Sequence, residues 1–228
     1  MSNTGSIEQR LGFIFNKPGL LIEALTHPSC LNENLSLCES SYQRLEFLGD
    51  AILGWVTAEE LFKRYPESPE GDLTRIRSHL VQESFLAGLA LDIGLDDDLR
   101  MGRGEEASGG RKRHSNLACT FEALIAAVYL DQGIETTKAL VIDLLRDEME
   151  RVELYGVPQD PKSTLQEVVQ ARFGTPPDYR VVNKEGPAHD QTFTVEVLMN
   201  GEVIGVGRGK RKLDAERAAA GMAIQKLS

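Results

Sequence analysis

Residues 43–50 read Gln-Arg-Leu-Glu-Phe-Leu-Gly-Asp, and two carboxylates lie there among the apolar residues that run from Leu45 to Leu53. Apolar side chains recur there every three or four positions, which predicts an amphipathic helix. Glu46 and Asp50 are four residues apart, so both project from the same face of this helix. Gly49 lowers helix stability at this point and therefore indicates the close approach of another backbone. Taken by itself, the acid pair fits either a metal site or a solvated acidic face.

Glu122 is a third isolated acid, in an apolar segment that runs to Leu130. Burying an unpaired carboxylate there would be costly, and a hard, oxygen-liganded cation such as Mg²⁺ would offset that cost for several acids at once. A run of basic residues at positions 111–113 precedes this segment. Basic side chains that hold a phosphate backbone beside a metal ion that activates water suit phosphodiester hydrolysis. A solvated turn is the alternative interpretation of the basic run.

Helical periodicity dominates the first part of the chain, and strand-like alternation begins only near residue 178. Helices are predicted over residues 45–56, 73–91, 117–130, 139–152, 163–173 and 214–227, and strands over 179–183, 193–199 and 203–206. Asn200-Gly201, between the second and third strands, predicts a tight hairpin. The expected fold class is a two-domain chain, α followed by α/β, in which an all-helical domain precedes a two-layer α-β-β-β-α domain.

The charge of the chain is unevenly distributed. Its net charge of −10 argues, as an average, against a nucleic-acid partner. Residues 1–158 carry a net charge of −11 and residues 159–228 a net charge of +1, which predicts two domains with different partners. A glycine and two prolines interrupt helical periodicity between these segments. We therefore expect a domain at residues 1–154, a linker at 155–161 and a second domain at 162–228.

The composition is that of an ordinary globular chain, with 41% hydrophobic and 26% charged residues. The longest strongly apolar stretch, residues 123–130, is too short to span a bilayer, and residues 1–6 lack the apolar core of a signal peptide. The cysteines indicate neither a disulfide framework nor a zinc-type pair. We therefore expect a cytoplasmic protein that makes no membrane contact.

Around the isolated acids and along most of the chain, the sequence resembles bacterial ribonuclease III. The motifs that carry the resemblance in the helical segment are Leu25-Thr-His-Pro-Ser29, Arg44-Leu-Glu-Phe-Leu-Gly-Asp-Ala-Ile-Leu53, Glu70-Gly-Asp-Leu-Thr-Arg75, Ser108-Gly-Gly110, Glu122-Ala-Leu-Ile125 and Tyr129-Leu-Asp131. The second segment resembles a double-stranded RNA-binding domain through Asp160-Pro-Lys-Ser-Thr-Leu-Gln-Glu167, Gly186-Pro-Ala-His-Asp-Gln-Thr-Phe193, Gly207-Arg-Gly209 and Ala215-Glu-Arg-Ala-Ala219. The resemblance covers residues 7–227, in order and with the spacing of the family.

The resemblance implies a homodimeric endoribonuclease that cuts double-stranded RNA with Mg²⁺, or with Mn²⁺ in its place. The products would carry 5′-phosphate and staggered 3′-hydroxyl ends, and ribosomal and other structured RNA precursors would be substrates. By position, Asp50 and Glu122 match the catalytic residues, and Glu46, Asp50 and Glu122 match metal ligands. Cys119 stands at a fourth ligand position that is usually an aspartate. Neither a membrane nor a small-molecule cofactor is implied.

Cys119 and Gln43 depart from the family pattern, which has an acid at both positions. A thiol is a poor ligand for Mg²⁺, and Gln43 removes a further negative charge from the same constellation. We favour an active enzyme because the other acids remain. The alternative is a catalytically weakened or inactive homologue that acts as a double-stranded RNA-binding protein. For Cys119 itself, a role with a soft metal and a role as a small apolar residue both stay open.

The residues that the resemblance assigns to RNA binding are Ser163, Gln166, Glu167, His189, Lys210, Arg211 and Lys212. The first three lie on the predicted helix over 163–173, which would contact ribose 2′-hydroxyls in a minor groove. His189 lies in a loop that would reach the next minor groove. The basic residues open the last helix, and they would hold phosphates with the help of its N-terminus.

Overall fold

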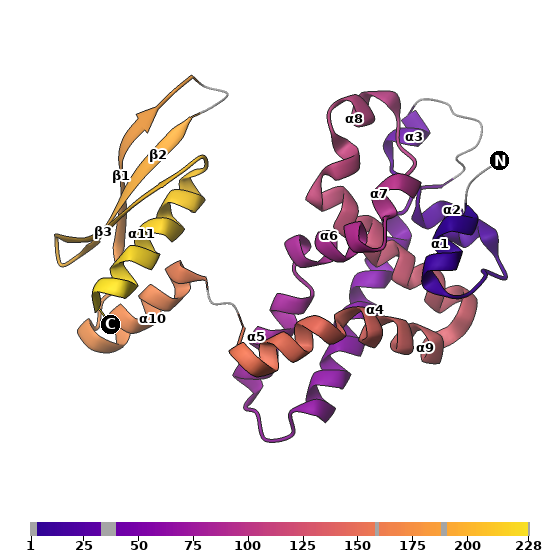
Figure 1. The fold of residues 1–228 in the computed structure, drawn as a ribbon, viewed down its shortest axis with the longest axis horizontal. Helices are drawn as coiled ribbons and strands as arrows, with labels where there is room; N and C mark the ends of the chain where they lie inside the picture. The colour runs from indigo at the N-terminus through magenta and orange to yellow at the C-terminus, as the bar shows by residue number, and fades with distance from the viewer. Residues whose placement is uncertain (1–3, 33–39, 158–159, 188–190, 228) are drawn as a thin grey trace. The chain divides into compact units, whose positions relative to one another are not determined.

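The computed structural model describes residues 4–32, 40–157, 160–187 and 191–227, and the chain divides into two compact units, Met1–Val157 and Pro158–Ser228 (Figure 1). The first unit is helical, and a three-stranded antiparallel sheet with two helices forms the second. The predicted fold class is therefore confirmed. The last helix of the first unit ends at Tyr155, and the first helix of the second unit begins at Pro161.

The helices of the first unit are α1 (Thr4–Leu11), α2 (Pro18–Ala24), α3 (Ser29–Asn32), α4 (Gln43–Arg64), α5 (Glu70–Leu80), α6 (Glu83–Asp92), α7 (Leu95–Asp98), α8 (Arg103–Ala107), the 3-10 turn η1 (Gly110–Lys112) and α9 (His114–Tyr155). The long helices α4 and α9 pack against each other, and α2 and α6 pack on α9 as well. Residues 123–128 of α9 are fully buried because helices surround this segment. Each large apolar side chain buried in this way contributes about 1.5–3 kcal/mol. The acids of α4 and α9 are thus attached to a rigid helical core.

The number of helices differs from the prediction at two places. The predicted helix over 73–91 is two helices, α5 and α6, separated at Gln82, which is extended with φ −72° and ψ 148°. Neither glycine nor proline marks this break in the sequence, so tertiary packing must impose it. The predicted helices over 117–130 and 139–152 form one helical run, α9, with a kink at Gly133, where φ is 80°. Glycine adopts this φ without steric strain.

Helix α9 is long and apolar enough to cross a membrane when only length and composition are considered. In the structure, 56% of its most apolar window is buried inside the chain. The short stretch at residues 123–130 therefore understated the apolar length of this helix. Its apolar side chains pack in the core of the first unit, which accounts for its composition.

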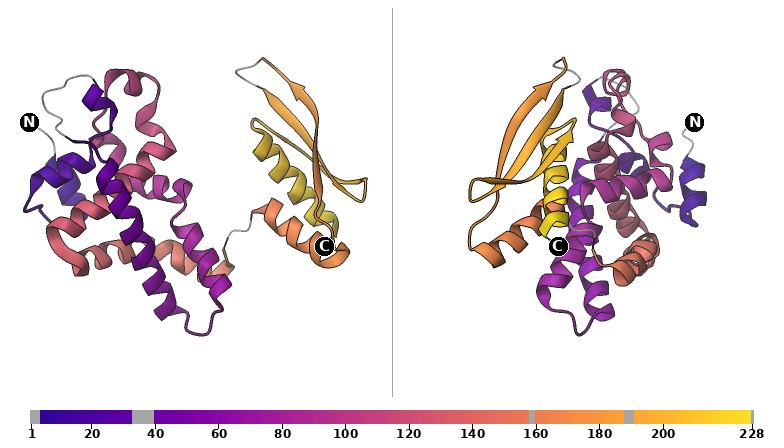
Figure 2. Two further views of the ribbon diagram at one scale, coloured as in Figure 1. Left: turned by 180° about the vertical axis from the view of Figure 1, so that it is seen from behind. Right: turned by 60° about the vertical axis from the view of Figure 1, so that its left-hand side comes forward.

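The second unit consists of α10 (Pro161–Phe173), β1 (Asp178–Glu185), β2 (Thr192–Met199), β3 (Glu202–Gly209) and α11 (Lys212–Leu227) (Figure 2). The strands form an antiparallel sheet in the order β1-β2-β3. Asn200 and Gly201 have φ angles of 50° and 86° and form the turn between β2 and β3, so the predicted hairpin is confirmed. Leu165 and Val169 of α10 share one core with α11 and the sheet. The predicted α-β-β-β-α order is confirmed.

Strand β3 lies unusually close to α11 because three of its residues have no side chain. Gly205, Gly207 and Gly209 alternate along β3, and all three face the backbone of α11. A Cβ atom at Gly207 would lie 2.2 Å from the backbone nitrogen of Ala219 and 2.3 Å from the carbonyl oxygen of Ala215. Side chains at these positions would push the helix off the sheet. The glycines therefore fix the N-terminal end of α11, where the basic residues 210–212 lie.

Candidate metal centre and nucleic-acid interface

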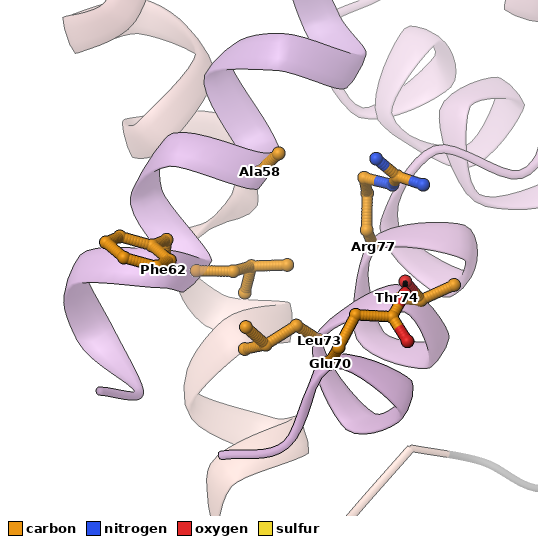
Figure 3. Close-up of a pocket in the computed structure, with 7 residues that line it drawn as sticks. Ala58, Phe62, Glu70, Leu73, Thr74 and Arg77 are labelled. Atoms are coloured by element: carbon orange, nitrogen blue, oxygen red, sulfur yellow. Dashed lines mark hydrogen bonds between the residues drawn. The ribbon is translucent and has the colours of Figure 1, made fainter. Parts of the chain in front are cut away.

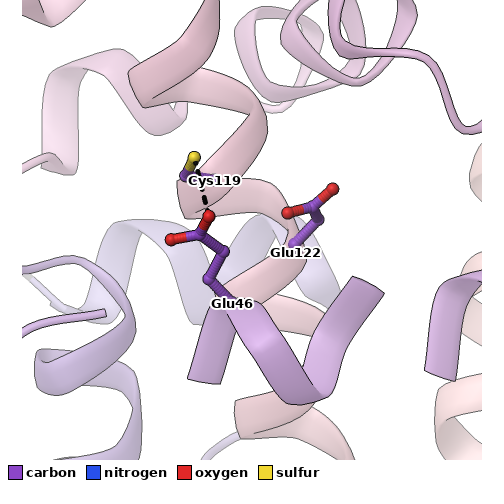
Figure 4. Close-up of side chains that lie close together, drawn as sticks. All are labelled: Glu46, Cys119 and Glu122. Carbon is purple, nitrogen blue, oxygen red and sulfur yellow. Dashed lines mark hydrogen bonds between the residues drawn. The ribbon is translucent and has the colours of Figure 1, made fainter. Parts of the chain in front are cut away.

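The structure brings together acids that are far apart in the sequence. Glu46 lies on α4, and Cys119 and Glu122 lie one turn apart on α9. One ligand atom from each of these side chains lies within 4.8 Å of the other two (Figure 4). All three side chains are half-buried. Asp50, one turn along α4 from Glu46, is exposed and lies outside this group of three.

The approach of α4 to α9 at this point depends on Gly49. A Cβ atom there would lie 1.8 Å from the carbonyl oxygen of Glu122 and 2.5 Å from its carbonyl carbon. No side chain can occupy that space, so only glycine allows the two helix backbones to come this close. The prediction that Gly49 marks a close backbone approach is confirmed, and the partner is the backbone of a site residue.

The charges of the site work against one another when no cation is present. Burial raises the pKa of Glu122 to about 7, and the negative charges of Asp50 and Glu46 add to this increase. Asp50 therefore interacts with Glu122 although it lies outside the group of three. A divalent cation would relieve both the burial cost and the repulsion, so the two half-buried carboxylates and Asp50 fit a metal centre.

Cys119 packs against the apolar core of the first unit and also makes a polar contact. Its thiol donates a hydrogen bond to Glu46 Oε1 across 3.2 Å. Burial, the hydrogen bond to Glu46 and the nearby carboxylates raise the pKa of Cys119 to about 12. Without a metal ion the group is thus a neutral thiol at physiological pH. Gln43, the other departure, is exposed at the start of α4 and accepts a long hydrogen bond of 3.5 Å from Ser41 Oγ.

The basic run at residues 111–113 is largely occupied within the first unit. Arg111 donates hydrogen bonds to the carbonyl oxygens of Asp96, at 2.6 Å, and Leu99, at 2.8 Å, and it also pairs with Glu106. Arg113 pairs with Glu105. Lys112, between them, is exposed. The two arginines therefore stabilise the turn before α9, in agreement with the alternative interpretation of this run as a turn.

In the second unit, the predicted RNA-binding residues that the structure describes are all exposed. Ser163, Gln166 and Glu167 lie on α10. Lys210 and Arg211 precede α11 by one or two positions, and Lys212 is its first residue, so the last helix begins two residues earlier than predicted. Arg211 pairs with Asp214 at 2.9 Å. His189 lies outside the described residues.

Comparison with known proteins assigns both units. A family model described as Ribonuclease-III-like matches residues 17–148, and one described as Double-stranded RNA binding motif matches residues 161–227. The chain is 45% identical over 222 residues to Ribonuclease 3 of Natranaerobius thermophilus, with 97% of this chain and 95% of that relative covered. The chain belongs to the ribonuclease III family. A second ribonuclease III-family relative, Ribonuclease 3 of Dehalococcoides mccartyi, is 44% identical over 227 residues, 100% of this chain and 96% of that relative.

Solved structures agree with the assignment of the helical unit. Two solved structures of the ribonuclease III nuclease domain of Campylobacter jejuni are each 37% identical to this chain, with TM-scores of 0.59 and 0.58. They cover 65% and 62% of this chain and 97% and 95% of their own. The latter was described for structural flexibility in the region involved in dimer formation. This chain is thus a ribonuclease III-type endoribonuclease by family, and its acidic group is a candidate metal centre in a generally metal-dependent class.

Glu105 is an acid beside the ribonuclease III centre that sequence reasoning missed. It accepts a hydrogen bond of 2.9 Å from Asn116 Nδ2, and Asn116 also donates to the carbonyl oxygen of Gly110 at 3.0 Å. Asn116 lies one turn before Cys119 on α9, so this contact ties the preceding loop to the metal centre. Burial and the charges of Cys119, Glu46 and Glu105 raise the pKa of Tyr42, which lies in the same region. Glu105 lies in an exposed, mixed-charge segment, so nothing in the local sequence distinguishes it.

Glu216, in the RNA-binding unit, is a second acid that the sequence analysis did not identify. It is buried, and it pairs with Lys162 of α10 at 2.7 Å and with Lys212 of α11 at 3.7 Å. The ammonium group of Lys162 also lies 4.9 Å from the centre of the Tyr179 ring. Glu216 therefore links the beginnings of the two helices that carry the predicted RNA contacts. Its helical spacing from Ala219, Ala220 and Ala223, which places it on the apolar face of this helix, is the sequence feature that could have identified it.

Proposed function

We propose that this chain hydrolyses the phosphodiester bonds of double-stranded RNA with Mg²⁺ as cofactor, and that Mn²⁺ can take its place. The products would carry 5′-phosphate and staggered 3′-hydroxyl ends, and ribosomal and other structured RNA precursors in the cytoplasm would be substrates. One observation carries the proposal. Glu46 and Glu122 converge near Asp50 in a ribonuclease III-type unit joined to a double-stranded RNA-binding motif.

Glu46, Asp50 and Glu122 would hold the cation, with Asp50 and Glu122 as the catalytic residues. When bound, the cation would neutralise phosphate charge and make water nucleophilic near neutral pH. Glu122 is held by the contact of α9 with Gly49, so its carboxylate keeps a fixed position in the site. Asp50 is exposed, so the RNA backbone can approach the site from its side. Cys119 donates its thiol hydrogen to Glu46 and thereby orients that carboxylate.

Residues 1–154 would form the nuclease and dimerisation domain, 155–161 the linker and 162–228 the RNA-binding domain. In the last of these, the exposed face of α10 with Ser163, Gln166 and Glu167 would contact ribose hydroxyls, and His189 would reach the next minor groove. Lys210, Arg211 and Lys212 would hold phosphates where α11 begins, since a helix N-terminus also favours an anion. The exposure of the described residues supports these roles.

A homodimer is the proposed assembly, and an apolar stripe on α4 supports it. Phe47, Trp55 and Phe62 lie at helical spacing on α4 and are 83%, 49% and 72% exposed. A pocket of about 180 Å³ between α4 and α5 continues this surface, lined by Phe62, Leu73 and Arg77 among others (Figure 3). Contiguous exposed apolar surface of this kind marks an interaction site. A second copy of the same chain is the partner because the related nuclease domain contains a region involved in dimer formation.

The test is cleavage of a long, perfect RNA duplex in Mg²⁺ and, separately, in Mn²⁺. The native chain, Glu122→Ala and Cys119→Asp are compared, and the folding of each is checked by circular dichroism. The native chain should cut and Glu122→Ala should not. The proposal is wrong if the native chain is as inert as Glu122→Ala in both metals while Cys119→Asp cuts.

The second candidate function is a double-stranded RNA-binding protein with weak or absent nuclease activity. The neutral thiol of Cys119 and the exposed amide of Gln43 favour it, because both replace acids of the family pattern. This second function is supported if the native chain binds duplex RNA but fails to cut it in either metal, and if the Cys119→Asp variant does cut it.

A further inference from the structure

The three converging side chains include one sulfur, and that sulfur changes which cations they can hold. We propose that Glu46, Cys119 and Glu122 bind a thiophilic divalent cation, such as Zn²⁺ or Cd²⁺, through two carboxylates and one thiolate. The inference rests on the proposed function in one respect, namely that Glu46 and Glu122 would be shared with Mg²⁺. Mg²⁺ would use Glu46, Asp50 and Glu122, and a thiophilic cation would use Cys119 in place of Asp50.

The spacing of the donor atoms supports this site. In a tetrahedral shell with metal–sulfur bonds of about 2.3 Å and metal–oxygen bonds of about 2.0–2.2 Å, the donor atoms lie roughly 3.4–3.6 Å apart. The Sγ atom of Cys119 and Oε1 of Glu46 are already 3.2 Å apart. A ligand atom of Glu122 lies within 4.8 Å of both, so a small side-chain rotation would bring the third donor into the shell and leave its fourth position open. Asp50 lies outside this group, which is why it is not assigned to the thiophilic cation.

The chemistry of the donors sets the selectivity. Thiolate sulfur favours Zn²⁺ and other soft or borderline cations, whereas Mg²⁺ prefers carboxylate, carbonyl and water oxygens. Binding replaces the S–H bond of Cys119 with a sulfur–metal bond, and the proton leaves to bulk water. Glu46 Oε1 already accepts the hydrogen bond from this thiol, so it offers the first acceptor for that proton. The step involves no oxidation or reduction.

The experiment is a titration of the RNA-free full chain with Cd²⁺, followed by the sulfur-to-cadmium charge-transfer absorption in the ultraviolet. The variants are Cys119→Ser, which keeps a hydrogen-bond donor for Glu46, and Cys38→Ser, which removes a thiol elsewhere in the sequence. The native chain and Cys38→Ser should show a saturable band with one equivalent of Cd²⁺. Cys119→Ser should lose this band and bind Cd²⁺ at least about tenfold more weakly, the loss typical of removing even an outer-shell partner.

Two results would overturn the inference: a native chain without the band, or a Cys119→Ser variant that keeps it. Cys119→Asp gives a second check, because it should lose the band and gain Mg²⁺ affinity. Since the titration contains no RNA, it is separate from the cleavage test. A chain that cuts RNA in Mg²⁺ but shows no band retains the proposed function and loses this inference. A chain that shows the band but fails to cut RNA retains this inference and loses the proposed function.

Discussion

The carbonyl oxygen of Glu122 occupies the space that a side chain at position 49 would need. A Cβ atom on Gly49 would lie 1.8 Å from that oxygen, which is a backbone atom and cannot rotate away. The same contact places Glu46, three residues before Gly49, opposite Cys119 and Glu122. The packing of the two helices and the geometry of the candidate metal centre therefore depend on the same glycine.

Gly49→Ala should destabilise the first unit and weaken cation binding together. The added methyl group must separate α4 from α9, and overpacking of this kind costs about 1–3 kcal/mol. Urea unfolding followed by Trp55, the one tryptophan of the chain, measures the loss of stability, and a Mn²⁺ titration measures binding. Gly54→Ala is the matched control, because it lies on the same helix and its Cβ atom would meet nothing within 4 Å. Equal effects of the two substitutions would contradict the packing argument.

The stability of the metal-free chain should fall as pH rises from about 4.5 to about 7, the ordinary and the raised pKa of Glu122. In this window the folded state binds more protons than the unfolded state, so the free energy of unfolding decreases with pH. The free energy of unfolding should fall by about 2 kcal/mol across this window, a figure that is reduced for the partial exposure of the carboxyl group.

Glu122→Gln isolates this contribution. The variant should be more stable than the native chain above pH 7, and the difference should shrink to nothing below pH 4.5. Saturating Mn²⁺ should restore the native chain at high pH, because a bound cation stabilises the charged carboxylate. Urea unfolding at a series of pH values, with and without Mn²⁺, provides the measurement. A pH-independent difference between the two chains would exclude Glu122 as its source.

Periodicity predicts the long helices of the first unit and the elements of the second, and the isolated acids predict the candidate centre, because both depend on local patterns. The short helices α1, α2, α3, α7 and α8 were not predicted. The break at Gln82 and the roles of Glu105 and Glu216 could not be predicted in this way. Each depends on partners distant in the sequence, as when Glu216 pairs with Lys162, 54 residues away. The same holds for the basic run at 111–113, since Arg111 donates hydrogen bonds to carbonyl oxygens of α7 and of Leu99 at its end, which the fold brings near. The local sequence shows which side chains are charged, whereas tertiary contacts determine which of them are free to bind a ligand and which are paired within the fold.

Gly207→Ala should weaken RNA binding by moving α11. Its Cβ atom would meet backbone atoms of α11 at 2.2 and 2.3 Å, so the helix must shift from the sheet and carry its N-terminal end with it. We expect a loss of about 1–3 kcal/mol in the stability of the second unit and weaker binding of duplex RNA. Gly221→Ala, on α11 itself, has open space at its Cβ atom and serves as the control. Calorimetry and filter binding provide the two measurements.

Phe62→Ser should shift the chain from dimer to monomer. Phe62 is 72% exposed and also lines the pocket between α4 and α5, so its removal deletes apolar contact area without opening the core. Sedimentation velocity over a range of protein concentrations measures the change. Leu154→Ser is the control, because Leu154 is 74% exposed near the end of α9 and does not lie on the α4 stripe. If both variants remain dimeric, the stripe is not the interface.

Replacing Lys210, Arg211 and Lys212 by alanine should lower both the affinity for duplex RNA and its dependence on salt. Each phosphate contact that is lost removes released counterions, so the slope of log affinity against log salt should fall by roughly one per contact. Arg211 is held by Asp214, so its guanidinium is oriented before RNA arrives and Arg211→Ala alone should already reduce the slope. Lys226→Ala removes one exposed cation from the opposite end of α11 and should leave the slope unchanged. A slope that responds equally to both changes would show that net charge, and not the position at the helix start, governs binding.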